Sequence, residues 1–451
     1  MLTASGPDLR ALLRDLPTLR DDPLGFFVDL ERRYGPVARL PFGPGRFAFL
    51  LSDPGAIQHV LQDQARRYTK RTFQYTTLSL VTGQGLLTSD GPVWLRQRRL
   101  MQPAFHRERL TGFTASMNAA AAGLAERWSV APDGQRVDVD RAMLALSLEI
   151  VGTTFFTTDL RADAPQLVSA VITALDHVIA RSRNPFAPPI WLPTPAHRAF
   201  KRAVGALDDA VTRLIAERRA GPPRPDLLQM LLDTRDEDGR PMEPRLLRDE
   251  LVTLIVAGHE TVASALTWAW ALLAQHPAAA DRLALEADAA ASAGSLDPRD
   301  LPFATAVFDE ALRLYPPAWL ITRQAAEDDD IEGLRVPAGS LVIVSPYVVQ
   351  RRAALWPEPD RFRPERFLEA APQRFAYLPF GAGPRLCIGQ GFARLEGPLI
   401  LANLARRVRL STESALPAIE PLVTLRPHGG LHLHVTRRVA SATPERSTST
   451  L

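Results

Sequence analysis

The stretch FGAGPRLCIG at residues 380–389 holds Cys387, the one cysteine of the chain. Gly381, Gly383 and Gly389 permit a tight turn that leaves backbone N–H groups on one side. The residues after Cys387 read as a helix whose positive N-terminal end faces the sulfur, and this predicts a thiolate of lowered pKa. Such a thiolate could be a nucleophile or a metal ligand, whereas a lone cysteine is otherwise a small buried hydrophobe. All three interpretations stay open at this point.

If Cys387 is a metal ligand, few metals can bind to a single cysteine. Zinc requires several Cys or His ligands at fixed spacing, and one cysteine with 9 scattered histidines does not supply them. A haem iron needs only one strong protein ligand, and the sequence meets that requirement.

A second candidate site lies in the apolar stretch TLIVAGHETVASALTW. His259 and Glu260 resemble the start of a zinc HExxH motif, but Ala263 stands where the second histidine would be. Glu260 and Thr261 are then polar groups within an apolar helix, where they need partners or a purpose, and Gly258 leaves room for a small molecule. The structural alternative is a Thr261 hydroxyl bonded back to its own helix and a Glu260 paired to an arginine.

Charged pairs form a third constellation. Glu310 and Arg313 of EALR share one helix face, but the same spacing recurs elsewhere, for example at Glu358 and Arg361. The pair gains meaning from the stretch RFRPERF, whose Arg366 could complete a Glu–Arg–Arg network. The alternative is an exposed ion pair worth under about 1 kcal/mol.

The stretch WLRQR is the fourth constellation, because Trp94 and Arg98 share a helix face at i, i+4. Together with Arg323 and Arg385 they offer donors for two carboxylates. Taken singly, they would be a core tryptophan and surface arginines.

The elements that must position these groups are mostly helical. Apolar periodicity and turn signals predict a mainly α protein with minor β, built in the following order. Residues 36–61 are expected to form short strands and a helix from about Pro54, and residues 92–220 are expected to be helical. A long helix is expected at 244–275 and another at 301–314, followed by short strands at 320–348. An irregular stretch at 350–385 leads to the last helix, which runs from near Cys387 to about 407.

Composition limits the class of protein. The 451 residues show no linker or repeat, so we expect one domain over 1–438 and a disordered tail over 439–451. One cysteine and a net charge of +3 without a basic run predict a cytoplasmic protein that binds no nucleic acid. The N-terminus fits neither a signal peptide nor a transmembrane anchor. Residues 184–199 are proline-rich and apolar, and they form either a loop packed on its own core or a lipophilic entrance lid that touches the membrane surface.

The ordered motifs WxxxR, AGxET, ExxR, PERF and FxxGxRxCxG together resemble the cytochrome P450 family of haem-thiolate monooxygenases over about residues 20–435. The resemblance implies the single-domain cytochrome P450 fold, with haem b between the long distal helix and the cysteine-loop helix. Cys387 would be the axial ligand of the haem iron. Thr261 and Glu260 would stabilise bound oxygen and relay protons. Glu310, Arg313 and Arg366 would form a structural network. One departure is Gln350, where many members have a histidine, and it puts a contact of the irregular stretch in doubt. Further haem contacts would be Trp94, Arg98, Leu87, Phe105, Ala257, Gly258, Arg323, Pro379, Phe380, Gly381, Arg385, Ile388 and Gly389.

A closer likeness concerns the substrate. The stretches TFQYTTLSLVTGQGLLT (72–88), EALRLYPPAWLITR and VTLRPHGGL resemble the bacterial carotenoid β-ring hydroxylases of this family, and 72–88 reads as a loop. The resemblance implies a monomer that hydroxylates β-carotene with electrons from a ferredoxin and a ferredoxin reductase. The alternatives are a fatty-acid or terpenoid hydroxylase and a non-catalytic haem sensor. The substrate wall would include Phe73, Gln74, Tyr75, Leu86, Val256, Leu320 and Ile321.

Overall fold

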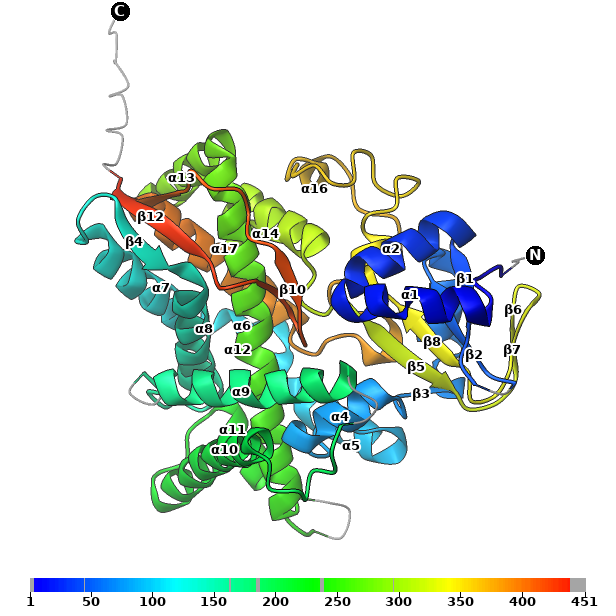
Figure 1. Ribbon diagram of the computed structural model, residues 1–451. Coiled ribbons are helices and arrows are strands. Elements are labelled where there is room, and N and C mark those ends of the chain that lie inside the picture. Colours follow the sequence, from blue (N-terminus) through cyan, green and yellow to red (C-terminus); the bar gives the residue numbers. More distant parts are fainter. Residues whose placement is uncertain are drawn as a thin grey trace, which may run out of the picture.

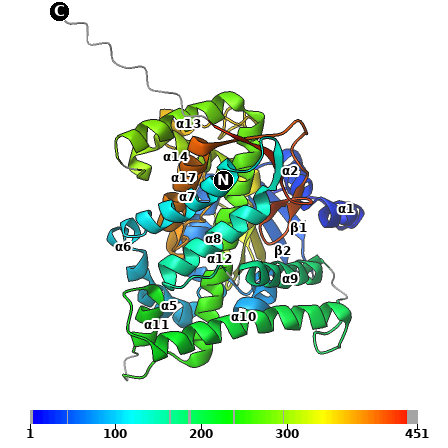
Figure 2. The same ribbon diagram turned by 90° about the vertical axis from the view of Figure 1, so that its left-hand side faces the viewer.

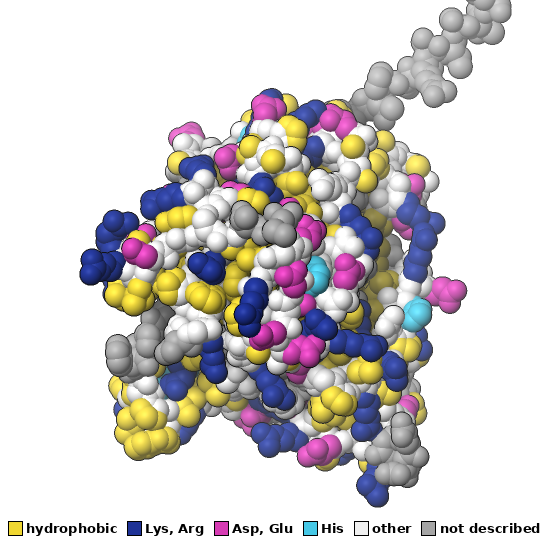
Figure 3. Space-filling model, turned by 90° about the vertical axis from the view of Figure 1, so that its right-hand side faces the viewer, with side chains coloured by type: hydrophobic (Ala, Val, Ile, Leu, Met, Phe, Trp, Pro, Cys, Tyr) yellow, Lys and Arg dark blue, Asp and Glu magenta, His cyan; other side chains and the backbone are white. Residues whose placement is uncertain are grey.

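The computed structural model describes residues 4–43, 45–161, 164–183, 187–235, 239–294 and 296–438. A helical part and a part built around a five-stranded sheet lie side by side (Figure 1). The predicted tail at 439–451 lies outside the described residues. On the face shown in Figure 3, basic and acidic side chains are interspersed rather than segregated.

The long helix α12 (Pro244–Gln275) is the axis of the helical part, and its predicted bounds are confirmed. It packs on α8 (Val139–Phe155) and α10 (Pro195–Ala220). Helix α9 (Ala164–Arg183) crosses it in the view of Figure 1, and α10 runs across its lower part in Figure 2. Among the described residues it is the one helix long and apolar enough to cross a membrane, and 83% of its most apolar window is buried within the protein. This burial is that of a core helix.

The other helices confirm a mainly α architecture, and the last one begins three residues after Cys387, close to the prediction. They are α1 (Leu9–Asp21), α2 (Pro23–Tyr34), α3 (Pro54–Gln58), α4 (Phe73–Thr82), α5 (Gly91–Met101), α6 (Arg107–Thr111), α7 (Thr114–Ser129), α11 (Leu227–Asp233), α13 (Pro277–Ser292), α14 (Pro302–Leu314), α15 (Pro346–Val349), α16 (Arg366–Glu369) and α17 (Gln390–Arg407). Short 3₁₀ turns occupy Ala65–Arg67, Gln102–Phe105, Pro298–Asp300 and Gly383–Arg385, and a π-turn occupies His59–Asp63.

The minor β part has the strands expected at 36–61 and 320–348. The largest sheet has the order β1-β2-β8-β5-β3, in which β2 and β8 are parallel and the other neighbours antiparallel. Its apolar faces pack on α1–α3 and on the irregular stretch before Cys387. The strands are β1 (Val37–Pro41), β2 (Phe47–Leu51), β3 (Tyr68–Thr69), β4 (Gln135–Asp138), β5 (Ile321–Ala325), β6 (Asp329–Ile331), β7 (Leu334–Val336), β8 (Leu341–Val344), β9 (Val408–Ser411), β10 (Ile419–Pro421), β11 (Leu425–Pro427) and β12 (His432–Arg437).

The prediction of a loop over 72–88 is wrong for its first part, which is helix α4. Threonines and valine weaken helix propensity there, so the sequence gives little sign of a helix. Packing on α9 and α12 overrides that preference, and the Thr77 hydroxyl donates back to the carbonyl of Phe73 (2.8 Å). Residues 83–88 form the turn that follows.

Candidate functional site

The loop around Cys387 is closed by a backbone hydrogen bond of 2.9 Å from the N–H of Cys387 to the carbonyl of Phe380. Gly381 and Gly383 have φ angles of +71° and +68°, which side chains other than glycine rarely adopt. A Cβ on Gly383 would also lie 1.8 Å from the backbone oxygen of Leu61. Glycine at these two positions therefore allows the turn of the loop, and at Gly383 it allows the loop to pack against the backbone of Leu61.

The sulfur of Cys387 lies at the N-terminus of α17, where the backbone N–H groups of Gly389 and Gln390 donate to it. The prediction of a lowered pKa is wrong for the protein alone. Burial raises the pKa of the Cys387 thiol, and the two N–H groups and the charge of Arg98 only partly offset it. The thiolate therefore needs a further positive partner, such as a metal ion.

The Cys387 side chain is nevertheless accessible to a water-sized probe. A thiol that is both surrounded by protein and accessible borders an internal space. On α12, every residue from Asp249 to Ala274 is buried except Ala257, Gly258 and Thr261, which share one helix face.

Aromatic rings connect that face of α12 to the cysteine loop. The prediction that Gly258 leaves room for a small molecule is wrong, because a Cβ there would lie 3.0 Å from Val151 and 3.8 Å from the ring of Phe155, both on α8. The same ring packs on Phe392 of α17, with centroids 4.6 Å apart, and on Phe105, at 5.5 Å. The accessible faces of α12 and of the cysteine loop therefore border one region.

Positive charge gathers beside this region. Arg385 lies 3.9 Å from the ring centroid of Trp94 and forms an ion pair with Asp90. Burial lowers the pKa of Arg385 to about 10, and the nearby charge of Arg323 adds to that effect, with Asp90 opposing it. Arg98 donates to the backbone carbonyl of Leu386 at 2.9 Å, next to Cys387. The structure thus brings together the four donors that the sequence singled out.

Lys70 is a fifth member of this group that the sequence reasoning missed. It is one of two lysines in the chain, and its Nζ donates to the carbonyl of Leu87 (2.7 Å) and lies 4.6 Å from the Tyr75 ring centroid. Burial lowers its pKa well below the usual value, and the charges of Arg323 and Arg385 add to the effect. Its position one residue after β3 carried no local signal; only its rarity could have drawn attention to it.

Among the described residues, the basic groups of Lys70, Arg98, Arg323 and Arg385 gather here around one carboxylate, that of Asp90, so the cluster has more basic than acidic groups. Buried charges are tolerated only when paired, so the cluster calls for anionic partners. The two propionates of haem b would supply them, and the Cys387 thiolate would take the axial position. The residues present therefore fit haem b.

Thr261 lies at the open face of α12 and Glu260 is buried beside it, and both make the contacts that the structural alternative predicted. The Thr261 hydroxyl donates back to the carbonyl of Ala257 (2.8 Å), and Glu260 lies 3.9 Å from Arg426. Glu260 also accepts from the Thr424 hydroxyl at 2.6 Å through Oε1, while its Oε2 has no partner among the described residues. Burial raises the pKa of Glu260, and Arg426 opposes this shift.

The residues expected to line the substrate lie at different depths. Phe73 is 59% exposed at the start of α4, whereas Leu86, Val256 and Ile321 are buried and Leu320 is partly buried. Ile321 lies 3.8 Å from where a Cβ of Gly381 would be, next to the cysteine loop.

Two further expected wall residues tie α4 to β5. Gln74 donates to the carbonyl of Leu320 (3.2 Å) and accepts from the Thr322 hydroxyl (2.7 Å). The Tyr75 hydroxyl accepts from Arg323 (3.4 Å), which places Tyr75 in the cation cluster. Of the remaining expected haem contacts, Pro379 is buried, and Leu87, Phe380, Ile388 and Gly389 are partly buried.

The Glu–Arg–Arg network forms as the resemblance implied. Both oxygens of Glu310 accept from Arg313 (2.7 and 2.9 Å), and Oε1 also accepts from Arg366 (3.1 Å), with Glu310 and Arg313 fully buried. Gln350 connects the end of α14 to the irregular stretch before Cys387. Its Nε2 donates to the Arg313 carbonyl (2.9 Å) and its Oε1 accepts from the Leu378 N–H (2.8 Å), so the departure at this position leaves the contact in place.

Comparison with known proteins agrees with this geometry. The sequence model of the family described as Cytochrome P450 matches residues 5–433. Cyclooctatin synthase of Streptomyces melanosporofaciens is 37% identical over 86% of this chain and 85% of its own, and the chloroplastic Protein LUTEIN DEFICIENT 5 of Arabidopsis thaliana is 30% identical over 92% and 74%. The crystal structure of CYP175A1 from Thermus thermophilus superposes with a TM-score of 0.80 at 35% identity and covers 96% of this chain and 99% of that one.

Proposed function

Because the chain belongs to the cytochrome P450 family, we propose that it hydroxylates the β-ionone ring of a carotenoid such as β-carotene. It is a haem b monooxygenase that takes electrons from a redox partner and acts on a lipophilic substrate. The overall reaction consumes the substrate, dioxygen, two electrons and two protons, and it yields the hydroxylated substrate and water. The observation that carries the monooxygenase assignment is the accessible Cys387 thiol beside the cation cluster, near the open face of α12.

Haem b, when bound, supplies the iron that activates dioxygen. Arg98, Lys70, Arg323 and Arg385 would hold its propionates by charge-assisted hydrogen bonds. The hydroxyl of Thr261 lies on the open face of α12 and gives its own hydrogen to Ala257, so its oxygen would accept a hydrogen bond from a proton donor there. Glu260 adjoins it, and the unpartnered Oε2 makes it the group that passes protons on.

The carotenoid substrate is supported by the stretches 72–88 and 310–323, which resemble carotenoid β-ring hydroxylases. A 30% identical relative carries in its name lutein, a hydroxylated carotenoid. In the structure these stretches meet, because Gln74 of α4 binds Leu320 and Thr322 around the start of β5. The wall that contacts the substrate would lie there.

A second candidate is hydroxylation of a cyclic terpenoid. It is favoured by the relative named for cyclooctatin, which is a terpenoid and shares 37% identity. Both substrates are isoprenoid hydrocarbons, so both fit an apolar site; they differ mainly in length.

The redox partner in this proposal is a ferredoxin with its reductase, and the enzyme is a cytoplasmic monomer of one domain. Contact with the membrane surface through 184–199 would give access to an oily substrate. Trp191 in this segment is 72% exposed, while Phe186 lies outside the described residues.

The test is turnover of purified holoenzyme with ferredoxin, reductase, NADPH and β-carotene under ¹⁸O₂. We expect a carotenoid product with one labelled oxygen on the ring. Product from a terpenoid or a fatty acid but none from β-carotene would overturn the substrate, while absence of turnover with every donor tried would favour a haem sensor.

A further inference from the structure

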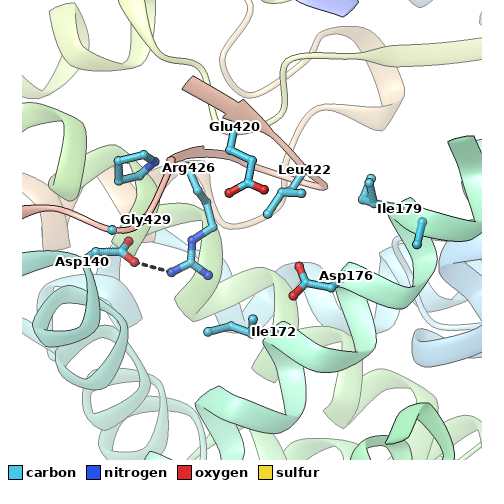
Figure 4. Close-up of a pocket in the computed structure, with 11 residues that line it drawn as sticks. Asp140, Ile172, Asp176, Ile179, Glu420, Leu422, Arg426 and Gly429 are labelled. Atoms are coloured by element: carbon cyan, nitrogen blue, oxygen red, sulfur yellow. Dashed lines mark hydrogen bonds and ion pairs between the residues drawn. The ribbon is translucent and has the colours of Figure 1, made fainter. Parts of the chain in front are cut away.

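A pocket of about 370 Å³, lined by both charged and apolar side chains, opens between α8, α9 and the hairpin β10–β11. Three carboxylates, Asp140, Asp176 and Glu420, surround the guanidinium of Arg426 in this pocket (Figure 4). Its size leaves room for several water molecules with polar partners. Glu260 does not line the pocket, but Arg426, which does, lies 3.9 Å from it.

Arg426 connects the pocket to α12. Its Nη2 donates to Asp140 at 2.5 Å and its Nη1 lies 3.9 Å from Glu260 Oε1. The Arg426 side chain is only 11% exposed, and Glu260 is buried. Thr424 of the same hairpin also binds Glu260 Oε1, so both contacts hold one oxygen and leave Oε2 free.

Acidic groups outnumber cations here. Four carboxylates face Arg426, from α8 (Asp140), α9 (Asp176), β10 (Glu420) and α12 (Glu260). Burial raises the pKa of Asp140, Asp176 and Glu260, while Arg426 lowers each of them. Acids crowded around one cation cannot all ionise, so the group shares protons that can move between its members.

Two histidines are also near this group. His259 of α12 is buried and its pKa is lowered by burial to about 4, so it stays neutral at neutral pH. Exposed His428 lies 3.6 Å from Glu420 on the outer side. Neither histidine supplies a second buried cation at neutral pH. Arg426 is therefore the positive charge that controls the protonation of Glu260.

We propose that this pocket is the route by which solvent protons reach Glu260, and that Arg426 is the positioning residue that directs Glu260 Oε2 to carry them. The proposal rests on the monooxygenase function. Each proton that Glu260 gives up through Oε2 is replaced by one from water in the pocket, by way of Asp140 and Asp176. Only O–H bonds break and form, and the electrons from the redox partner balance the charge of the two protons used per turnover.

The first experiment follows the protonation of Glu260 without turnover. Infrared spectra are recorded against pH, and the carboxylic-acid C=O band of Glu260 is identified by its loss in Glu260→Gln. In Arg426→Ala we expect the midpoint of this band to rise by about one pH unit or more, because an opposite charge at such distances favours the carboxylate by that amount. The control is Arg352→Ala, which removes an arginine of similar exposure (14%) that pairs with Glu31 at 2.9 Å far from α12. It should leave the Glu260 band unchanged.

The second experiment measures proton delivery in the holoenzyme. Arg426→Ala should lower kcat about tenfold and increase the ratio of rates in H₂O and D₂O, since general acid catalysis is worth roughly 10²–10⁴-fold and Arg426 acts only through the acid. Haem content, the carbon monoxide spectrum and the Kd for substrate should match those of Arg352→Ala. A purely structural role for Arg426 would instead change haem content and Kd and leave the isotope ratio alone.

The pocket itself is tested by the double variant Asp176→Asn/Glu420→Gln, which leaves both contacts of Arg426 in place and remains informative if Arg426→Ala does not fold. We expect a lower kcat and a larger solvent isotope ratio than in wild type. Wild-type values in the double variant, or an unshifted Glu260 band in Arg426→Ala, would overturn the proposal. Rates are measured on whichever lipophilic substrate the wild type hydroxylates, so a failure of the carotenoid assignment gives a different result from a failure of the proton route.

Discussion

Lys70 Nζ donates a hydrogen bond of 2.7 Å to the backbone carbonyl of Leu87, and by this contact the end of β3 holds the turn after α4. The same ammonium lies with Arg323 and Arg385 in a buried cluster whose one carboxylate is Asp90. Burial and these two arginines lower the pKa of Lys70, so the ammonium stays charged there only beside a further anion of the working protein. We take that anion to be a haem propionate.

Replacing Lys70 by methionine should therefore weaken haem binding. A charge-assisted hydrogen bond is worth about 1.5–3 kcal/mol, which corresponds to roughly 10–100-fold faster haem loss if the whole effect falls on dissociation. Transfer of haem to an excess of apomyoglobin measures the rate. Lys201→Met is the matched control, because Lys201 is the other lysine and is exposed. Equal rates of haem loss for both variants would rule out a role for Lys70.

Thr261→Ala should uncouple the enzyme. The variant lacks the hydroxyl that would hold a proton donor at the open face of α12. We therefore expect several-fold less product per dioxygen consumed and more hydrogen peroxide. Thr261→Ser should restore most of the coupling. Thr154→Ala is the control, since its hydroxyl also bonds back within its helix (2.6 Å) but is buried in α8. Undiminished coupling in Thr261→Ala would assign Thr261 a structural role alone.

Glu310→Gln should destabilise the protein strongly. It leaves the buried Arg313 guanidinium without a compensating charge, and breaking one side of a buried ion pair costs about 3–5 kcal/mol. Urea unfolding of the holoenzyme measures the loss. Glu358→Gln breaks a pair of the same i, i+3 spacing whose side chains are more than half exposed, and it should leave the unfolding midpoint unchanged. Similar midpoints for the two variants would contradict the buried network.

Glu396 predicts a dependence of stability on pH. Its two carboxylate oxygens are buried, and burial raises its pKa from 4.5 to about 8, while the neighbouring Ser147 hydroxyl opposes the shift. The folded state holds this proton more tightly than the unfolded one, so stability is lost as pH rises from about 4.5 to about 8.

Glu396→Gln should remove that loss, because the amide stays neutral. Its unfolding free energy should exceed that of wild type increasingly from pH 5 to pH 8, as measured by urea titrations at both values. Exposed Glu413→Gln serves as the control and should follow wild type at both pH values. A constant difference between Glu396→Gln and wild type across this range would show that Glu396 does not titrate there.

Local patterns were enough to predict α12, α14 and the cysteine turn, because each depends on residues close together in the chain. Glu310 and Arg313 are three apart on one helix, and the glycines around Cys387 act within ten residues. The order of such motifs along the chain then predicted Arg366 and the four haem-side donors. Helix α4 was not predicted because its residues have weak helix propensity. Its helical form depends on packing against α9 and α12, which lie far away in the sequence.

The acid–base surroundings of Glu260 were beyond local patterns. Thr424 lies 164 residues from Glu260, and Arg426 lies 286 residues from Asp140, so no spacing rule connects them. The pKa of Cys387 was predicted from the helix N-terminus alone, whereas the structure shows that desolvation outweighs it. In both cases the missing information is three-dimensional burial.

Competition between substrates measures whether this monooxygenase acts on the ring of a carotenoid. The holoenzyme, ferredoxin and reductase are given equal amounts of β-carotene, a cyclic terpene and a fatty acid under ¹⁸O₂, and the label in each product is measured by mass spectrometry. We expect most of the label to enter the β-ring of the carotenoid. Label confined to the terpene or the fatty acid would contradict it.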